Sequence, residues 1–268
     1  MKKNRIIPII ILRNGEIVQS YGFEKYKVIG NAVKAVERFS QWDADEIIYI
    51  DITPHSLKSG ARQDLNTTKL LNRKDLISEV SKRSTMPLTF GGGLRSTQDI
   101  EEMIYCGADK VSLNTTLLED SRTVKRAVEM LGSQAIVASI DYGVVDDQEV
   151  VWNPSSRTYT QRKLIDWVRE VEQFGVGEIL LTCVSRDGSR QGYDLRAIER
   201  VSSSTNLPVI ANSGVGDWTH LIEGLEVGAD AVAAANIFHF FDQSVYLARK
   251  FLYDAGLPVR KPTLASIV

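Results

Sequence analysis

Cysteine and histidine, the residues most often used as metal ligands and redox centres, are scarce in this chain. It has two cysteines and three histidines in 268 residues. Cys106 and Cys183 lie far apart in apolar segments, so we expect two free, buried thiols in a reducing compartment rather than a disulfide. His55, His220 and His239 have no spacing typical of metal ligands. We therefore expect no metal and no other cofactor.

Long apolar runs and an excess of charge of one sign are also missing. No stretch approaches the ~20 apolar residues that a membrane-spanning helix requires. The N-terminal MKKNRIIPIIIL has the charge pattern of a signal peptide, but its apolar run is short and no small-residue cleavage site follows. The net charge of −2 gives no basic field for nucleic acid or an anionic membrane. These absences favour a cytoplasmic protein with no membrane or nucleic-acid partner.

What the chain does contain is a regular alternation of short β-rich runs with amphipathic helical segments. The predicted strands cover residues 5–12, 46–52, 86–90, 109–113, 135–141, 178–184, 207–212 and 229–235. Eight strands, each followed by a helix, are typical of a (β/α)8 barrel, with a doubly wound open sheet as the alternative. Residues 147–161 are expected to form an inserted β-hairpin after the fifth strand, turning at Asn153-Pro154.

An internal repeat favours the barrel over the open sheet. The segment 207–236 resembles the segment 86–115, with Pro208, Gly214 and a Gly-Ala-Asp triplet in equivalent places. Such self-similarity indicates a duplicated unit. A duplicated four-strand half closes naturally as eight strands. We therefore predict a single-domain (β/α)8 TIM barrel over 1–268, built from half-barrels of about residues 1–131 and 132–256.

Two glycine-rich loops in equivalent positions of the repeat predict two phosphate sites. FGGGLRSTQDI (90–100) and NSGVGD (212–217) each join a strand to a helix. Glycine allows backbone N–H groups to approach an anion, and a helix N-terminus favours negative charge. Small polar residues follow one strand later, at Asn114-Thr115 and Ala235-Asn236, and the loop after the sixth strand adds donors at Asp187 and Gly188. Two opposed sites imply a small molecule with a phosphate at each end.

Four charged residues begin strands that are otherwise apolar, and would lie at the opposite, N-terminal mouth of the barrel. They are two cations and two carboxylates: Arg5, Glu46, Lys110 and Glu178. A salt-bridged plug is one interpretation, because this face of a barrel usually serves stability. A gate through which a small molecule enters the barrel is the other. The charges alone favour the plug.

The chain resembles the cyclase subunit of imidazole glycerol phosphate synthase, in the histidine-biosynthesis barrel family. The resemblance is carried, in order and over nearly the full length, by RIIP, ADEIIYIDIT, TFGGGLRS, GADKVSLNT, GSQAIVASID, GEILLT, RDGSRQGYDL and FHF. It implies a glutaminase partner that docks on the N-terminal barrel face as a heterodimer and releases ammonia. The ammonia crosses the barrel and reacts with a bisphosphorylated ribulosyl aminoimidazole carboxamide. The products are imidazole glycerol phosphate and an aminoimidazole carboxamide ribotide.

By position, the resemblance assigns a role to each group of residues described above. The four charged residues become an ammonia gate, which reverses the preference for a plug. Asp109 and Gln134 match positions on the glutaminase-facing side. The implied phosphate contacts are Gly92, Gly93, Asn114, Thr115, Asp187, Gly188, Ser213, Gly214, Ala235 and Asn236. Ser213 and Asn236 depart from the family, which usually has Gly and Ser there.

Catalysis in the family uses two aspartates, as general acid and general base, at the ends of the first and fifth strands. Asp141 matches the residue of the fifth strand, but the matching residue of the first strand is Ile11, which cannot transfer a proton. Two further departures lie nearby. Gln19, in an expected flexible loop after the first strand, replaces a substrate-contacting lysine, and SSRTYTQ (155–161) replaces a Gly-Lys-Lys-x-Thr-Gly pattern.

Three functions are compatible with this pattern. The first is an ammonia-conducting barrel that serves a sugar amidotransferase. It is suggested by GEIVQSYGFEKYKVIGNAVKAVERF, which resembles a paralogous branch from surface-polysaccharide (O-antigen type) gene clusters, where an N-acetyl group becomes an acetamidino group. The second is an ordinary cyclase of histidine biosynthesis that tolerates Ile11 or recruits another base such as Asp51. The third is a non-enzymatic phosphate sensor or scaffold.

Overall fold

Eight parallel strands close into a barrel in the computed structural model, which describes residues 3–54, 73–239 and 244–263. Around the barrel they are β1 (Arg5–Arg13), β4 (Ile47–Asp51), β5 (Leu88–Gly91), β6 (Lys110–Leu113), β7 (Ile136–Val145), β10 (Glu178–Cys183), β11 (Val209–Asn212) and β12 (Ala231–Ala234). The first and last strands pair with each other, Arg5 opposite Ala231. The predicted barrel is confirmed, and the doubly wound alternative is wrong because the sheet has no open edge between these strands.

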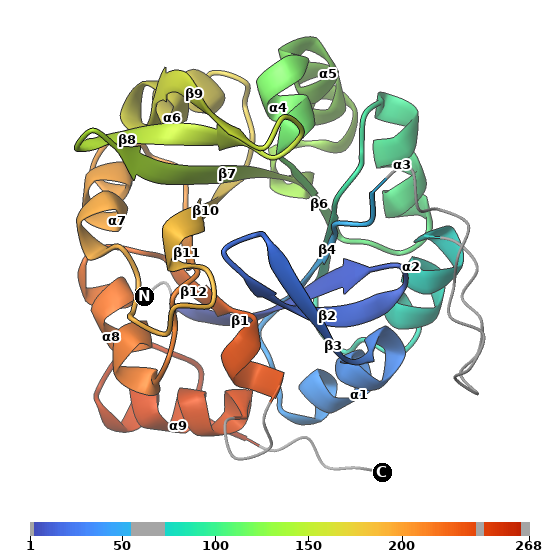
Figure 1. The fold of residues 1–268 in the computed structure, drawn as a ribbon. Helices are drawn as coiled ribbons and strands as arrows, with labels where there is room; N and C mark the ends of the chain where they lie inside the picture. The colour runs from blue at the N-terminus through green and yellow to red at the C-terminus, as the bar shows by residue number, and fades with distance from the viewer. Residues whose placement is uncertain (1–2, 55–72, 240–243, 264–268) are drawn as a thin grey trace.

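Helices form an outer ring around the strands (Figure 1). The longer ones are α1 (Ala32–Gln41), α2 (Arg73–Ser81), α3 (Thr97–Tyr105), α5 (Ser121–Leu131), α6 (Leu164–Glu172), α7 (Leu195–Ser202), α8 (Trp218–Glu226) and α9 (Val245–Asp254). Short helical turns follow β6, β10 and β12: α4 (Thr115–Glu119), η3 (Val184–Arg186) and η4 (Asn236–His239). Among the described residues, none of the helices has the length and apolar character needed to cross a membrane.

Strand β1 illustrates why the barrel strands are apolar on both faces. Ile7 and Ile9 point into the barrel, where they pack with Ile48, Val137 and other small aliphatic side chains. Ile6 and Ile10 point outward into the layer between strands and helices. Side chains alternate along a strand, so a strand covered on both faces reads as a continuous apolar run.

Two β-hairpins lie over the carboxyl ends of the barrel strands (Figure 1). The pair β8 (Gln148–Asn153) and β9 (Thr158–Lys163) confirms the predicted insertion, and Asn153 Oδ1 accepts the Ser155 N–H at 2.8 Å within its turn. The pair β2 (Glu16–Tyr21) and β3 (Lys25–Asn31) replaces the expected flexible loop, so that expectation is wrong. Asn14 and Gly15 have φ of +54° and +77°, the conformation that joins two strands in a tight hairpin.

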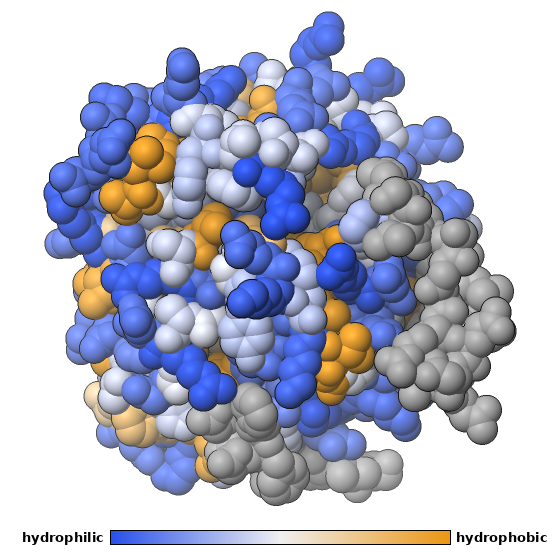
Figure 2. Space-filling model, viewed as in Figure 1, coloured by the Kyte–Doolittle hydropathy of each residue, from blue (hydrophilic) through white to orange (hydrophobic). Residues whose placement is uncertain are grey.

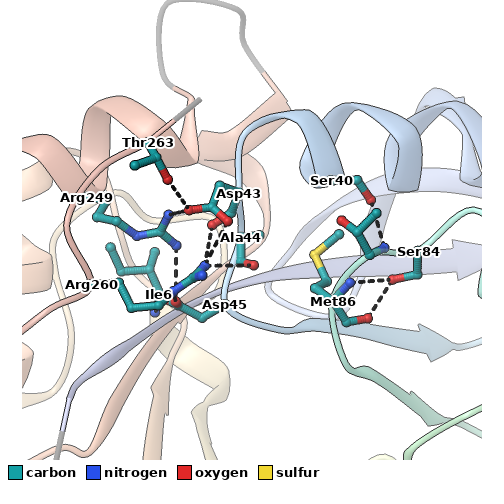
Figure 3. Close-up of polar contacts among 11 residues, drawn as sticks. Ile6, Ser40, Asp43, Ala44, Asp45, Ser84, Met86, Arg249, Arg260 and Thr263 are labelled. Atoms are coloured by element: carbon teal, nitrogen blue, oxygen red, sulfur yellow. Dashed lines mark hydrogen bonds and ion pairs between the residues drawn. The ribbon is translucent and has the colours of Figure 1, made fainter. Parts of the chain in front are cut away.

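A buried ion network ties the end of the chain to the N-terminal mouth of the barrel (Figure 3). Arg249 on α9 is fully buried and contacts Asp43 Oδ2 at 2.9 Å and Asp45 Oδ1 at 3.2 Å. Arg260 bridges the same two aspartates, and Asp45 Oδ2 accepts the Ile6 N–H at 2.8 Å. The network therefore fixes the start of β1 against the segment that precedes β4.

We expect Arg249→Met to lower the free energy of unfolding by about 3 kcal/mol, because it removes one partner of a buried ion pair. Lys250→Met is the control, since Lys250 pairs with Asp254 on the exposed surface of the same helix. The loss there should be below about 0.5 kcal/mol. Urea unfolding of both variants measures the difference; similar losses would contradict the assignment.

Candidate active-site cavity and charged ring

A cavity of about 590 Å³ lies at the carboxyl ends of the barrel strands, beneath the two hairpins. Its floor is formed by side chains from the strand ends, including Ile11, Asn114, Asp141, Thr182 and Asn212. Figure 2 shows this face of the molecule, whose surface over the barrel axis is largely hydrophilic. Parallel strands bring their carboxyl ends to one rim, which is where barrel enzymes place their active sites.

Asp141, on β7, is a carboxylate of the cavity lining, and the residue is 7% exposed. Its Oδ2 accepts the Asn114 amide at 2.8 Å, and Asn212 donates to the neighbouring Thr182 hydroxyl at 3.1 Å. Burial raises the pKa of Asp141 to about 7; the Asn114 hydrogen bond opposes this rise and the charge of Asp187 adds to it. A carboxyl with this pKa can accept or donate a proton near neutral pH.

Ile11 lies on the opposite wall of the cavity from Asp141. Strands β1 and β7 are four places apart in the ring of eight, so they face each other across the barrel. Ile11, Ile50 and Ala235 pack on the apolar interior and form a continuous apolar wall. Polar side chains of the floor therefore come from the ends of β6, β7, β10 and β11, whereas Ile11, Ile50 and Ala235 are aliphatic. Arg13 and Asp51, the last residues of β1 and β4, add charged groups to the cavity lining.

Asp51, which the sequence offered as a replacement base, already has partners. Its Oδ1 accepts the Thr53 N–H at 2.9 Å, and its Oδ2 lies 3.6 Å from Nε of Arg73. Arg73 also donates to the Gly93 carbonyl at 3.3 Å. Both carboxylate oxygens of Asp51 therefore already have partners in the protein.

The first glycine loop lies at the cavity wall together with Asn114 and Thr115, as predicted. Gly92 and Gly93 have φ of +102° and +64°. A Cβ on Gly92 would lie 2.0 Å from the Asp51 carbonyl oxygen, so backbone packing requires this glycine. The structure therefore brings all four residues predicted for this phosphate site to one region.

The residues predicted for the second phosphate site also line the cavity: Asp187, Gly188, Ser213, Gly214, Ala235 and Asn236. Their polar side chains, however, contact the protein itself. Asp187 Oδ2 accepts the Ser20 hydroxyl at 2.7 Å and the Phe23 N–H at 3.3 Å, and the Asn236 amide donates to the Ser20 carbonyl at 3.0 Å. The β2–β3 hairpin is thus fastened over this side of the cavity. Burial also raises the pKa of Asp187 above its usual value, although Ser20 and Phe23 donate to it.

Several cavity residues were missed from the sequence. Arginine side chains line the wall at Arg13, Arg73, Arg95, Arg157 and Arg190. They are spread along the chain in loops, at a strand end and at the start of α2, with no common motif. Gln19, by contrast, is buried and absent from the cavity lining, because β2 places its neighbour Ser20 on the cavity side.

At the other end of the barrel, Arg5, Glu46, Lys110 and Glu178 form a closed ring of ion pairs. Arg5 donates to both carboxylates, and Nζ of Lys110 lies 3.1 Å from Glu46 and 3.3 Å from Glu178. Burial alone would lower the pKa of Arg5, but hydrogen bonds and charges from Glu178 and then Glu46 raise it. The ring and the cavity floor lie at opposite ends of one apolar interior.

Asp109 and Gln134 lie near the start of β6 and β7, at the same end as the ring. Asp109 Oδ2 accepts the Leu88 N–H at 2.8 Å, and Gln134 is exposed, with its amide near the Leu131 carbonyl at 3.3 Å. Both cysteines are free thiols, Cys183 buried and Cys106 half-buried. His55 lies outside the described residues, and within the part of the chain that is described no three His, Cys, Asp or Glu side chains are grouped as metal ligands would be.

The raised pKa of Asp141 makes a prediction about stability and pH. An unfolded aspartate titrates near 3.9, so between about pH 4 and 7 the folded state binds the extra proton and its stability falls as pH rises. We expect Asp141→Asn to remove this loss, so that wild type and variant diverge by up to about 4 kcal/mol across this interval. Denaturant unfolding of both proteins from pH 4.5 to 8.5 measures it; a constant difference would contradict the assignment.

Comparison with known proteins agrees with this architecture. The family described as histidine biosynthesis protein matches residues 5–243. Imidazole glycerol phosphate synthase subunit HisF of Chlorobaculum parvum is 37% identical over 97% of this chain and its own full length, and that of Sulfurisphaera tokodaii is 36% identical with the same coverage. A Vibrio vulnificus protein provisionally named imidazole glycerol phosphate synthase subunit hisF2 is 38% identical over 97% of this chain and 92% of its own length. The chain therefore belongs to the histidine biosynthesis protein family, as a homologue of the HisF cyclase subunits.

Proposed function

We propose that this barrel receives ammonia from a glutaminase partner and conducts it to the cavity, and that the ammonia then serves amidination of a sugar in surface-polysaccharide biosynthesis. One observation carries the proposal: the charged ring is complete at one end of the barrel, whereas the catalytic carboxylate pair is broken by Ile11 at the other. The parts needed to receive ammonia are retained, and a part needed to consume it is missing.

The ring supports the gate role because its charges balance and each carboxylate is shared between two cations. In a water-filled opening the charged side chains would be hydrated. Here the four side chains pair with one another at the mouth of the apolar interior. A shift of one Lys110 contact would open a path for a neutral molecule as small as ammonia. Inside, Ser112 Oγ is buried without a hydrogen-bond partner among the described residues, so a passing ammonia could bind it.

The alternative is an active cyclase of histidine biosynthesis. It is favoured by the relatives, whose names assign them to imidazole glycerol phosphate synthase. In this case another group would replace the carboxylate of the first strand. The ion pair of Asp51 with Arg73 weighs against Asp51 in that role. In a non-enzymatic phosphate sensor or scaffold, the charged ring would only stabilise the barrel.

We expect the wild-type chain, supplied with ammonium and the bisphosphorylated cyclase substrate, to turn over about 10²–10⁴ times more slowly than Ile11→Asp. The variant restores a second proton-transferring group facing Asp141. Ile11→Asn is the matched control, because its amide has the size of aspartate and no acid–base function. Rapid turnover by the wild-type chain would favour the alternative function.

The docking of the glutaminase can be tested with two exposed residues near opposite ends of helix α5. Gln134 follows its C-terminal end at the ring side of the barrel, and Arg122 lies in its first turn at the cavity side. We expect Gln134→Arg to weaken binding of the glutaminase about tenfold by steric and charge conflict, and Arg122→Gln to leave it unchanged. Titration calorimetry with the purified partner measures both. Equal effects of the two variants would exclude docking on this face.

A further inference from the structure

Asp141 has no task in the proposed function, because the carboxylate that would face it is replaced by Ile11. Its surroundings nevertheless form an ordered polar group. Asp141, Thr182 and Asn212 are register partners on the neighbouring strands β7, β10 and β11, so they lie side by side. Asn212 donates to the Thr182 hydroxyl at 3.1 Å, and Asn114 donates to Asp141 Oδ2 at 2.8 Å. Hydrogen bonds within the group therefore hold Asp141 in place.

This group still has oxygen atoms that can accept hydrogen bonds. An ionised carboxylate has about four acceptor positions, and Asp141 uses two of them for Asn114 and Thr182. Ser112 precedes Asn114 by two residues, so its side chain points into the same interior one layer deeper, and Ser139 has the same relation to Asp141. The Ser112 hydroxyl is buried and has no hydrogen-bond partner among the described residues. These acceptors suit a small ligand that donates several hydrogen bonds.

The charge next to Asp141 also favours a cation. After burial, which raises the pKa of Asp141 most, the charge that raises it further is that of a second carboxylate, Asp187. No arginine of the described cavity wall contributes to this pKa. A buried carboxylate without a cationic partner is costly in its ionised form, so a small cation bound to Asp141 would stabilise that form.

Ammonia that leaves the apolar interior of the barrel meets this group first. The inward side chains below it, Val137 and Leu180, are aliphatic, and neutral ammonia passes them without the cost of burying a charge. At Asp141 it meets a carboxyl group that is partly protonated at neutral pH, and ammonia is the stronger base. The carboxyl proton moves to the ammonia nitrogen. The products are a carboxylate and an ammonium ion, with no change in total charge.

We propose that Asp141, together with the hydroxyls of Thr182 and Ser112, forms an ammonium-binding site at the cavity floor, where delivered ammonia is held until an acceptor takes it. Release reverses the proton transfer: the proton returns to Asp141, and neutral ammonia reacts with the acceptor. The inference rests on the proposed delivery of ammonia, and it gives Asp141 a task that needs no second carboxylate.

The test follows the titration of Asp141 in the full-length chain by ¹³C NMR of its carboxyl group. Ammonium chloride should lower the pKa of Asp141 by about one unit relative to potassium chloride at equal ionic strength, because a bound cation stabilises the ionised form. Potassium is the matched control, since it has the charge and nearly the size of ammonium but no hydrogen to donate. In calorimetric titrations, ammonium should bind about tenfold more weakly at pH 6 than at pH 8, where Asp141 is mostly ionised.

Three variants locate the site. Asp141→Asn should abolish the preference for ammonium over potassium, because an amide carries no charge. Ser112→Ala should weaken ammonium binding about tenfold, through the loss of one hydrogen bond to a charged ligand. Asp51→Asn removes another carboxylate of the cavity lining, one whose oxygens have partners in the protein, and should leave the preference unchanged. Thermal unfolding checks that each variant folds, and Ser112→Ala tests the site even if Asp141→Asn does not fold.

Equal effects of ammonium and potassium, ammonium binding that does not change with pH, or an equal loss in Asp51→Asn would each overturn the inference. Added ammonium reaches the cavity from solvent, so these outcomes do not depend on the ring or on the glutaminase. A chain that binds ammonium at Asp141 but neither binds nor stimulates the glutaminase would contradict the proposed function alone. A chain that delivers ammonia from glutamine without any preference for ammonium would contradict this inference alone.

Discussion

Closure of the sheet between β1 and β12 is the constraint on which the other features depend. Because β1 pairs with both β12 and β4, every second residue of β1 points into the barrel at a defined depth. Reading along the strand, Arg5 lies in the charged ring, Ile7 and Ile9 in the apolar interior, and Ile11 at the cavity floor. One strand thus carries both Arg5 and Ile11, the residues on which the proposed ammonia entry and the proposed loss of cyclisation depend.

The proposed function assigns two tasks to the opposite ends of the barrel, ammonia entry to the charged ring and proton transfer to the cavity. The ring needs only charged residues at the starts of four strands, and these contact one another in the structure. Proton transfer at the cavity needs two acid–base groups facing each other, and Ile11 leaves Asp141 facing an aliphatic wall. We propose that the first task has been kept and the second given up, with the ammonia passed on to another acceptor.

Much of this arrangement could be predicted from the sequence, because short apolar runs alternating with amphipathic helical segments are typical of a (β/α)8 barrel. The family resemblance placed Ile11 and Asp141 at the ends of the first and fifth strands, and the Asn153-Pro154 turn indicated the β8–β9 hairpin. The strands β2 and β3 were missed, although Asn14-Gly15, which forms the tight turn between β1 and β2, is a hairpin signal. Their position over the cavity depends on contacts between residues far apart in sequence, such as Ser20 with Asp187. Arg73 was missed for the same reason, since only the fold brings it to Gly93.

The most direct measurement follows the ammonia nitrogen itself. The wild-type barrel, its glutaminase partner and the bisphosphorylated cyclase substrate are incubated with glutamine labelled with ¹⁵N at the side-chain amide, and the products are analysed by mass spectrometry. Our account predicts that the label is recovered as free ammonium and that the substrate remains intact. Incorporation of the label into an imidazole ring at a rate matching glutamine hydrolysis would contradict it.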